Sequence, residues 1–451
     1  MKKQFLISVL GILTDLIAAA LLFSACRPIS PDYEETEYAV VIYGILGGKM
    51  DYLMEDAWEE VRTFLPDKKV RVFCRYKYGN GGDQFSGKWC DPGEVVTFEL
   101  TQDTRFEDLR AKGLQDPTFE MFKPENLAEV LAAARQTASP SKGCVLIFFG
   151  HGGGFNPTTD YPKERFGTVA PVTRGILSDE WFQGNVTMNM YEIGEAIETS
   201  GIGHLAGFLL HDCLMGGIET LTQLEDNADY FIATPFMLTS EDNPMIPYLV
   251  KNLAGNSFET AARKTLLESK ERLIASFRSE EPDDFPGNVE LVKSSELAGV
   301  CKATESLATR LCQLYPTQRE AIDRATNQAY RFYSLHPYFD LLDYARILSE
   351  ETGDGQLRDI AAEMKAAFGR TILEQITIDT DTHPTLDSYS LSVILIDNDI
   401  YNNYPTRGLF SFPQSYEYSR FHHLTHWGDW LNTNLQFPTG NPCGQQMEIL
   451  E

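Results

Sequence analysis

One segment of the chain constrains the fold more than any other: residues Cys144–Phe149 form an unbroken apolar run that ends at a glycine-rich turn. A short run of this kind is typical of a strand that is buried on both faces, as in parallel sheets covered by helices. Similar runs alternate with amphipathic helical patterns through the first half of the chain. This alternation predicts an α/β fold in which helical layers cover both faces of a mostly parallel sheet.

The expected elements of the first half follow from these patterns. Strands are predicted at Tyr38–Leu46, Lys69–Tyr76, Cys144–Phe149, Leu205–Leu210 and Tyr230–Ala233, and helices at Asp51–Leu65, Glu125–Thr137, Met190–Ser200 and Leu214–Leu224. Residues 152–188 are rich in Gly, Pro, Thr and Asp and are too long for an ordinary connection. We interpret them as a functional loop.

A polar break at Arg278–Asn288 separates the first α/β domain, residues 38–277, from a C-terminal region, residues 289–451. The apolar residues that follow the break, beginning with Leu291 and Val292, are expected to lie in a helix. A β segment is predicted further on, at Tyr389–Ile396.

The charge of the chain argues against two classes of partner. It has 65 Asp and Glu against 38 Lys and Arg, a formal net charge of −27. Such an excess repels phosphate backbones and anionic lipid headgroups, so nucleic-acid binding and polybasic membrane attachment are both disfavoured. Hydrophobic residues make up 43% of the chain, which is ordinary for a folded protein and excludes disorder as a global description.

The N-terminus carries the signature of export. Two lysines precede an apolar stretch that ends in Phe23-Ser24-Ala25-Cys26, which is the layout of a bacterial secretory signal ending in a lipobox. We therefore predict a lipoprotein signal peptide at residues 1–25, lipidation at Cys26 and an acidic tether at residues 26–37. The protein is then an exported lipoprotein of the cell envelope, held at the membrane by its lipid and either periplasmic or surface-exposed. A membrane anchor that is never cut is the alternative.

The residues best suited to catalysis follow two of the predicted strands. His151 follows Cys144–Phe149 on a glycine-rich turn, and Cys213 follows the next parallel strand, before a predicted helix whose N-terminus would favour the thiolate. Carboxyl ends of parallel strands meet at one edge of the sheet, where ligands bind. A thiolate that attacks a peptide carbonyl needs a proton donor for the leaving amine and amide donors for the oxyanion. His151 and the Gly152 amide can supply both.

Metal and disulfide patterns are weaker. The eight cysteines include no CxxC pair, and a Cys74–Cys90 disulfide is left open by the sequence. His422, His423 and His426 suggest a metal, but abundant aromatic neighbours and the lack of a matching carboxylate motif favour structural packing. We therefore predict no metal site, and the proposed chemistry requires no cofactor.

The residues that follow the two strands resemble the clostripain family of cysteine peptidases, relatives of gingipains, legumain and caspases. The specific blocks are His151-Gly152 and Cys213-Leu214-Met215-Gly216, and the tail from Gly408 to Pro413 supports them. The resemblance implies a caspase-like three-layer sandwich with a C-terminal helical and β region, a His151–Cys213 dyad and endopeptidase activity on proteins or peptides. Only the resemblance, and no motif of this sequence, implies a role for Ca²⁺.

One departure from the family pattern bears on specificity, and one property of the family bears on maturation. The family usually carries an Asp two residues before the Cys, where it helps to line a pocket for Arg or Lys. Here that place holds His211, and the acid is displaced to Asp212, so both are candidate substrate-binding residues. Family members are often cut in the loop after the His, and Lys163, Arg165 and Arg174 are candidate processing sites.

The primary hypothesis is therefore an exported cysteine endopeptidase that works through a Cys–His dyad, with its preference at the residue before the scissile bond left open. The changed pocket at His211 motivates an alternative, a binding lipoprotein that keeps the caspase-like fold without turnover. A transpeptidase is a third class, because an amine can resolve an acyl-enzyme as well as water can.

Overall fold

The computed structural model describes residues 36–46, 51–65, 69–79, 89–155, 176–179, 186–238, 243–280, 287–332, 337–378, 389–395 and 416–435. The predicted signal peptide, Cys26, most of the tether and the three candidate processing residues lie outside this part of the chain. Within it, no helix combines the length and the apolarity that crossing a bilayer would require.

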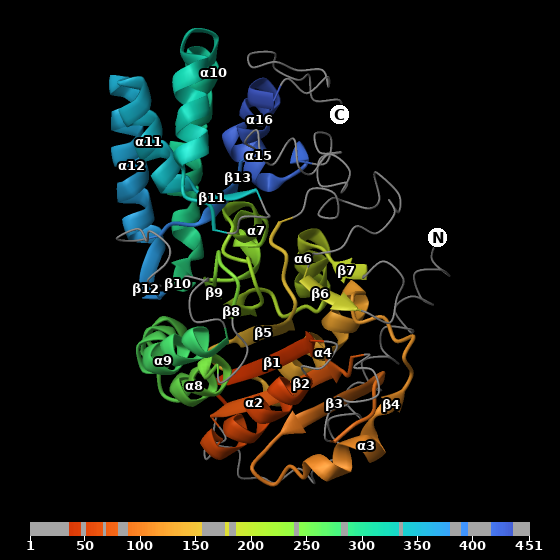
Figure 1. Cartoon of the computed structure of the whole chain (residues 1–451). Coiled ribbons are helices and arrows are strands. Elements are labelled where there is room, and N and C mark those ends of the chain that lie inside the picture. The colour runs from red at the N-terminus through yellow and green to blue at the C-terminus, as the bar shows by residue number, and fades with distance from the viewer. Residues whose placement is uncertain are drawn as a thin grey trace.

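The centre of the protein is a sheet whose nine strands, among the residues described, run in the order β12-β10-β9-β8-β5-β1-β2-β3-β4 (Figure 1). Five central strands are parallel to one another: β1 (Tyr38–Ile45), β2 (Val70–Lys77), β5 (Cys144–Gly150), β8 (Leu205–His211) and β9 (Tyr230–Ala233). Antiparallel strands extend both sides: β3 (Glu94–Leu100), β4 (Leu114–Gln115), β10 (Gly287–Lys293) and β12 (Ile372–Ile378). The predicted, mostly parallel sheet is confirmed.

Helices cover both faces of the sheet, as the unbroken apolar strands require (Figure 1). One face packs against α2 (Asp51–Phe64), α8 (Met245–Leu253) and α9 (Phe258–Glu280). The core on the other face includes α4 (Pro124–Ala138), α6 (Met190–Thr199), α7 (Ile218–Gln223), α10 (Leu297–Gln328), α11 (Leu341–Thr352) and α12 (Gly355–Thr371). It extends to α15 (Arg420–Thr425) and α16 (Trp427–Leu435), which pack on α7 and α10. Alternate residues of β1 enter the two cores, since Val41 and Tyr43 belong to one and Val40 and Ile42 to the other.

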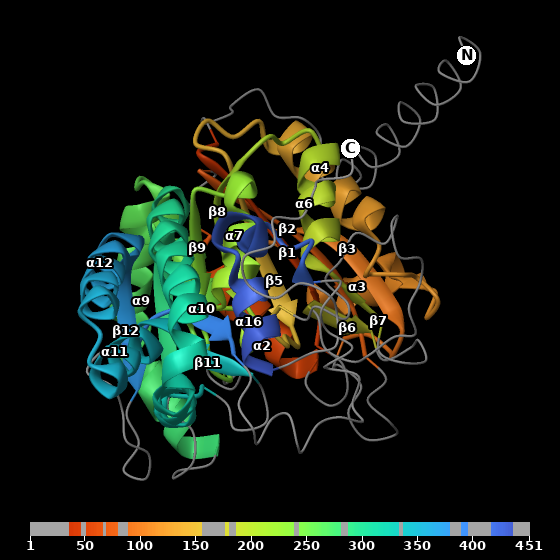
Figure 2. The ribbon, with the colours of Figure 1, turned by 90° about the horizontal axis from the view of Figure 1, so that it is seen from above.

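The region after the polar break completes this sheet. β10 pairs with β9 and β12 pairs with β10, while Figure 2 shows α10, α11 and α12 grouped at one side of the molecule. Leu291 and Val292 therefore lie in a strand and not in a helix, and the helical region expected after the break begins at Leu297, in α10. Leu291 and Val292 each pack into a different core, one on each face of β10. Two adjacent apolar residues in a strand buried on both faces give no alternation by which the sequence could distinguish it from a helix.

Two further expectations need correction near the predicted site. The loop at residues 152–188 contains an antiparallel hairpin, β6 (Ile176–Asp179) with β7 (Val186–Met188). The helix expected from Leu214 begins at Ile218, because Leu214 has a positive φ of 62° that a helix does not tolerate. Cys74 and Cys90 are both free thiols, so the disulfide left open between them is not formed.

Candidate active site

The two predicted strand ends are neighbours. β5 and β8 pair in parallel with Phe149 opposite His211, and His151 and Cys213 each follow two residues after this last pair. The turns that follow touch through their backbones: a Cβ built on Gly152 would lie 2.3 Å from the carbonyl oxygen of Cys213 and 3.0 Å from its amide nitrogen. The structure thus brings His151, Gly152 and Cys213 together at one edge of the sheet. Only glycine fits at position 152 without moving the backbone that carries the thiol.

The four predicted site side chains differ in accessibility. His151 is exposed and Cys213 is half-buried, so both can meet a ligand at the edge of the sheet. His211 and Asp212 are only 3% and 1% exposed. The predicted substrate-binding pair, His211 and Asp212, is therefore buried, whereas the predicted catalytic pair is accessible.

The loop after Cys213 is held by a neighbouring segment that the sequence did not reveal. Leu214 adopts left-handed backbone geometry, which is uncommon for a large side chain and is found where surrounding contacts impose it. Its amide donates to the carbonyl of Phe236 over 2.8 Å, and the amide of Leu238 donates to the Cys213 sulfur over 3.2 Å. The helix expected from Leu214 begins four residues later, at Ile218, whereas the Leu238 amide is a backbone donor that contacts this sulfur directly. A backbone donor leaves no signature in the sequence.

His211 is a neutral side chain at physiological pH. Its ring stacks on Phe149 with centroids 5.1 Å apart and planes 20° from parallel. Burial lowers the pKa of His211 to about 4. Its Nε2 atom is buried without a hydrogen-bond partner in the described part of the chain. At neutral pH it therefore offers no charge of either sign to a ligand.

Asp212 is neutral as well. Neither carboxyl oxygen makes a hydrogen bond of ordinary geometry within the described residues, and both are inaccessible to solvent. Burial raises the pKa of Asp212 from 3.8 to about 8, outweighing the opposite effect of the nearby Gly150 amide. The displaced acid therefore does not restore the negative charge that His211 lacks.

The C-terminal region contacts the loop after Cys213 directly. The Ser392 amide donates to the carbonyl of Gly216 over 3.0 Å. Glu219 of α7 is buried, and one of its carboxyl oxygens accepts from the Ile394 amide and from the Tyr416 hydroxyl, each over 2.9 Å. Burial raises the pKa of Glu219 to about 7. These residues fix the loop that carries Cys213 to segments 175 to 197 positions away in the sequence.

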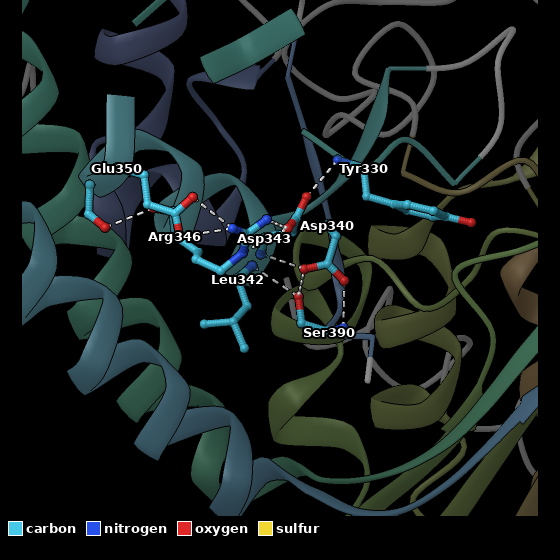
Figure 3. Close-up of polar contacts among 8 residues, drawn as sticks. Tyr330, Asp340, Leu342, Asp343, Arg346, Glu350 and Ser390 are labelled. Carbon is cyan, nitrogen blue, oxygen red and sulfur yellow. Dashed lines mark hydrogen bonds and ion pairs between the residues drawn. The ribbon is translucent and has the colours of Figure 1, made fainter. Parts of the chain in front are cut away.

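A buried carboxylate secures the strand that lies beside those segments. Asp340 ends β11 (Tyr338–Asp340) and accepts hydrogen bonds from the Asp343 amide and from the amide and hydroxyl of Ser390, over 2.6–2.8 Å (Figure 3). Asp343 in turn accepts from the Tyr330 amide and pairs with Arg346. The start of α11 and the segment at 389–395 are thereby locked to each other.

The described residues provide no obvious metal centre. Among them, no group of three or more His, Cys, Asp or Glu side chains is arranged to hold an ion. His422 is buried and its Nδ1 atom accepts a hydrogen bond from the Gly428 amide over 3.1 Å. His422 is therefore packed as predicted, whereas His423 and His426 are exposed.

Comparison with known proteins decides the family. The sequence model of the clostripain family, the C11 peptidases, matches residues 97–389, a span that includes both turns of the site. The chain belongs to the clostripain family. It is thus a cysteine peptidase by family, as its residues predicted. No curated protein matches the chain in sequence.

Solved structures agree with this assignment at the level of the fold. A secreted C11 cysteine protease from Bacteroides thetaiotaomicron, in complex with an irreversible peptide inhibitor, has a TM-score of 0.55 and 16% identity over 86% of this chain and 99% of its own. An inactive zymogen C11 protease from Parabacteroides distasonis has a TM-score of 0.56 and 12% identity over 88% of this chain and 99% of its own. The predicted caspase-like architecture is confirmed.

Proposed function

We propose that the chain is an endopeptidase in which Cys213 is the nucleophile and His151 the proton donor. The contact of Gly152 with the Cys213 backbone carries the proposal, because it holds the His151 turn against the nucleophile. The Cys213 sulfur attacks the peptide carbonyl to form a thioester, and His151 protonates the amine that leaves. Water then resolves the thioester with His151 as the base. The Gly152 amide is the donor we assign to the oxyanion.

The two candidate substrate-binding residues favour substrates without a basic side chain before the scissile bond. Arg or Lys at that position needs a carboxylate partner when it is desolvated. His211 and Asp212 are both neutral at pH 7, because burial lowers the pKa of the first to about 4 and raises that of the second to about 8. We therefore propose weak cleavage after Arg and Lys and better cleavage after uncharged residues.

The test uses purified mature protein and acyl-oxymethyl-ketone probes that differ in the residue before the reactive carbonyl. Wild type should be labelled at Cys213, and most strongly by uncharged probes. Cys213→Ala should be inert and unlabelled, and His151→Ala should be slower by roughly 10²–10⁴-fold because proton transfer is impaired. Cys144→Ala removes a buried free thiol elsewhere on β5 and is the matched control, with labelling retained.

Two outcomes would contradict the proposal. Peptidase activity in Cys213→Ala would exclude the thiol as the nucleophile. A folded wild type that no probe labels would favour the alternative function, a partner-binding protein that keeps the fold, for which the loss of charge at the pocket is the supporting observation. Strong cleavage after Arg would instead show that another acid lines the pocket.

We further propose that the protein acts in the cell envelope after export, with Cys26 lipidated and the loop after His151 cut during maturation. The lipobox-like sequence supports the first step. The length of the loop and its basic residues support the second. A secreted relative of similar fold is consistent with a site of action outside the cytoplasm.

A further inference from the structure

Tyr338 reaches the His151 turn from the C-terminal region. Its hydroxyl lies 2.5 Å from the carbonyl oxygen of Gly153 and 3.1 Å from that of Phe155, and it donates its proton to this pair of acceptors. Gly153, Phe155 and Tyr338 are all buried, so few other donors can reach these carbonyls. A buried carbonyl that loses its donor is destabilising, because no water replaces the lost hydrogen bond.

The Tyr338 ring also fixes the shape of the turn. Gly154 has a positive φ of 71°, and a Cβ there would lie 2.7 Å from the Tyr338 hydroxyl oxygen and 2.9 Å from the carbonyl oxygen of Leu214. The turn is therefore enclosed between Tyr338 on one side and the nucleophile loop on the other. Three consecutive glycines have the greatest backbone freedom a chain offers, so their conformation depends on such contacts.

Tyr338 is itself held firmly. It lies on β11, which pairs antiparallel with β13 (Ser392–Ile394), where Tyr338 is opposite Ile394. The Asp340 network closes the far end of β11 (Figure 3). β13 in turn donates to the nucleophile loop through Ser392. One small two-stranded sheet thus contacts the His151 turn through Tyr338 and the Cys213 loop through Ser392.

We propose that Tyr338 is a positioning residue of the peptidase reaction. Its hydroxyl fixes the backbone of Gly153–Phe155 and so places His151, which is exposed and at the start of that turn, for proton transfer at Cys213. The inference rests on the proposed Cys–His chemistry. It assigns a catalytic consequence to a strand that lies 125 residues beyond Cys213 in the sequence.

The test is Tyr338→Phe, which removes the hydroxyl and keeps the ring that packs on Gly154. We expect kcat for a peptide substrate to fall roughly 10- to 100-fold, as expected when a reacting group is displaced by about 1 Å, with KM little changed. The rate of Cys213 alkylation by iodoacetamide should be measured against pH. In Tyr338→Phe it should lose the same part of its pH dependence that His151→Ala removes. A purely structural role for Tyr338 would not change that profile.

Tyr344→Phe is the matched control. Tyr344 is fully buried, and its hydroxyl accepts from Thr326 between α10 and α11, among the C-terminal helices. The same chemical change there should leave kcat and the alkylation profile unchanged. 4-Aminophenylalanine at position 338 restores a donor and should recover most of the kcat that Tyr338→Phe loses.

Each result has one meaning. An active wild type with unchanged kcat and alkylation profile in Tyr338→Phe would overturn the inference while leaving the proposed function intact. An inactive wild type would instead refute the proposed function. If Tyr338→Phe does not fold, the 4-aminophenylalanine variant tests the inference instead. A folded form of this variant that is as slow as His151→Ala would overturn the inference.

Discussion

Gly152→Ala should inactivate the enzyme by separating its two catalytic turns. The added methyl group would lie 2.3 Å from the Cys213 carbonyl oxygen and 2.7 Å from the Asp212 Cβ. Carbon contacts are comfortable only from about 3.5 Å, so the backbones must move apart by about 1 Å. A displacement of that size between reacting groups lowers kcat/KM by roughly 100-fold. The strain lowers the free energy of unfolding by about 1–3 kcal/mol, which leaves the protein folded.

The assay compares kcat/KM and urea unfolding of wild type, Gly152→Ala and a control. Gly369→Ala is that control, because Gly369 is exposed on α12, and a Cβ there meets nothing within 4 Å. It should keep full activity and gain about 0.5–1 kcal/mol from higher helix propensity. Wild-type kcat/KM in a folded Gly152→Ala would refute the close contact between the turns, and unfolding of Gly152→Ala would show that the contact is needed for the fold itself.

Three further predictions concern charge, export and maturation. Burial raises the pKa of Asp212 to about 8, so its favourable contribution to stability is present below pH 4 and lost as pH rises towards 8. Asp212→Asn should therefore raise the thermal midpoint at pH 8 more than at pH 4, and equal shifts would contradict this. Cys26→Ser should abolish lipid labelling and membrane retention in cell fractions; normal retention would exclude lipidation there. Active wild type should be cleaved between residues 152 and 188, and Cys213→Ala should remain intact. N-terminal sequencing checks this, and a single intact and fully active chain would exclude processing.

The fold was predictable where one pattern sufficed. Central strands such as Cys144–Gly150 are unbroken apolar runs because both faces are covered, and a glycine-rich turn marks where they end. β10 was missed because its buried residues do not alternate, and the helix expected at Leu214 was misplaced because left-handed geometry at a leucine has no sequence signal.

The residues of the candidate site also differ in whether a sequence pattern could predict them. His151 and Cys213 could be proposed from the sequence because their side chains have distinctive chemistry and follow neighbouring parallel strands. Leu238 and Tyr338 were not found, because they act on the site through a backbone amide and a contact to backbone carbonyls. Contacts of this kind are set by the packing of segments far apart in the chain, which no local pattern records.

The small sheet formed by β11 and β13 also sets the order in which the protein can become active during synthesis. Cys213 and His151 leave the ribosome long before the residues that support their turns, and Ile394 is among the last of these to emerge. Long-range pairings of this kind form late, because they pay the entropy of closing a long loop. An incomplete chain therefore carries both reactive side chains without the scaffold that aligns them.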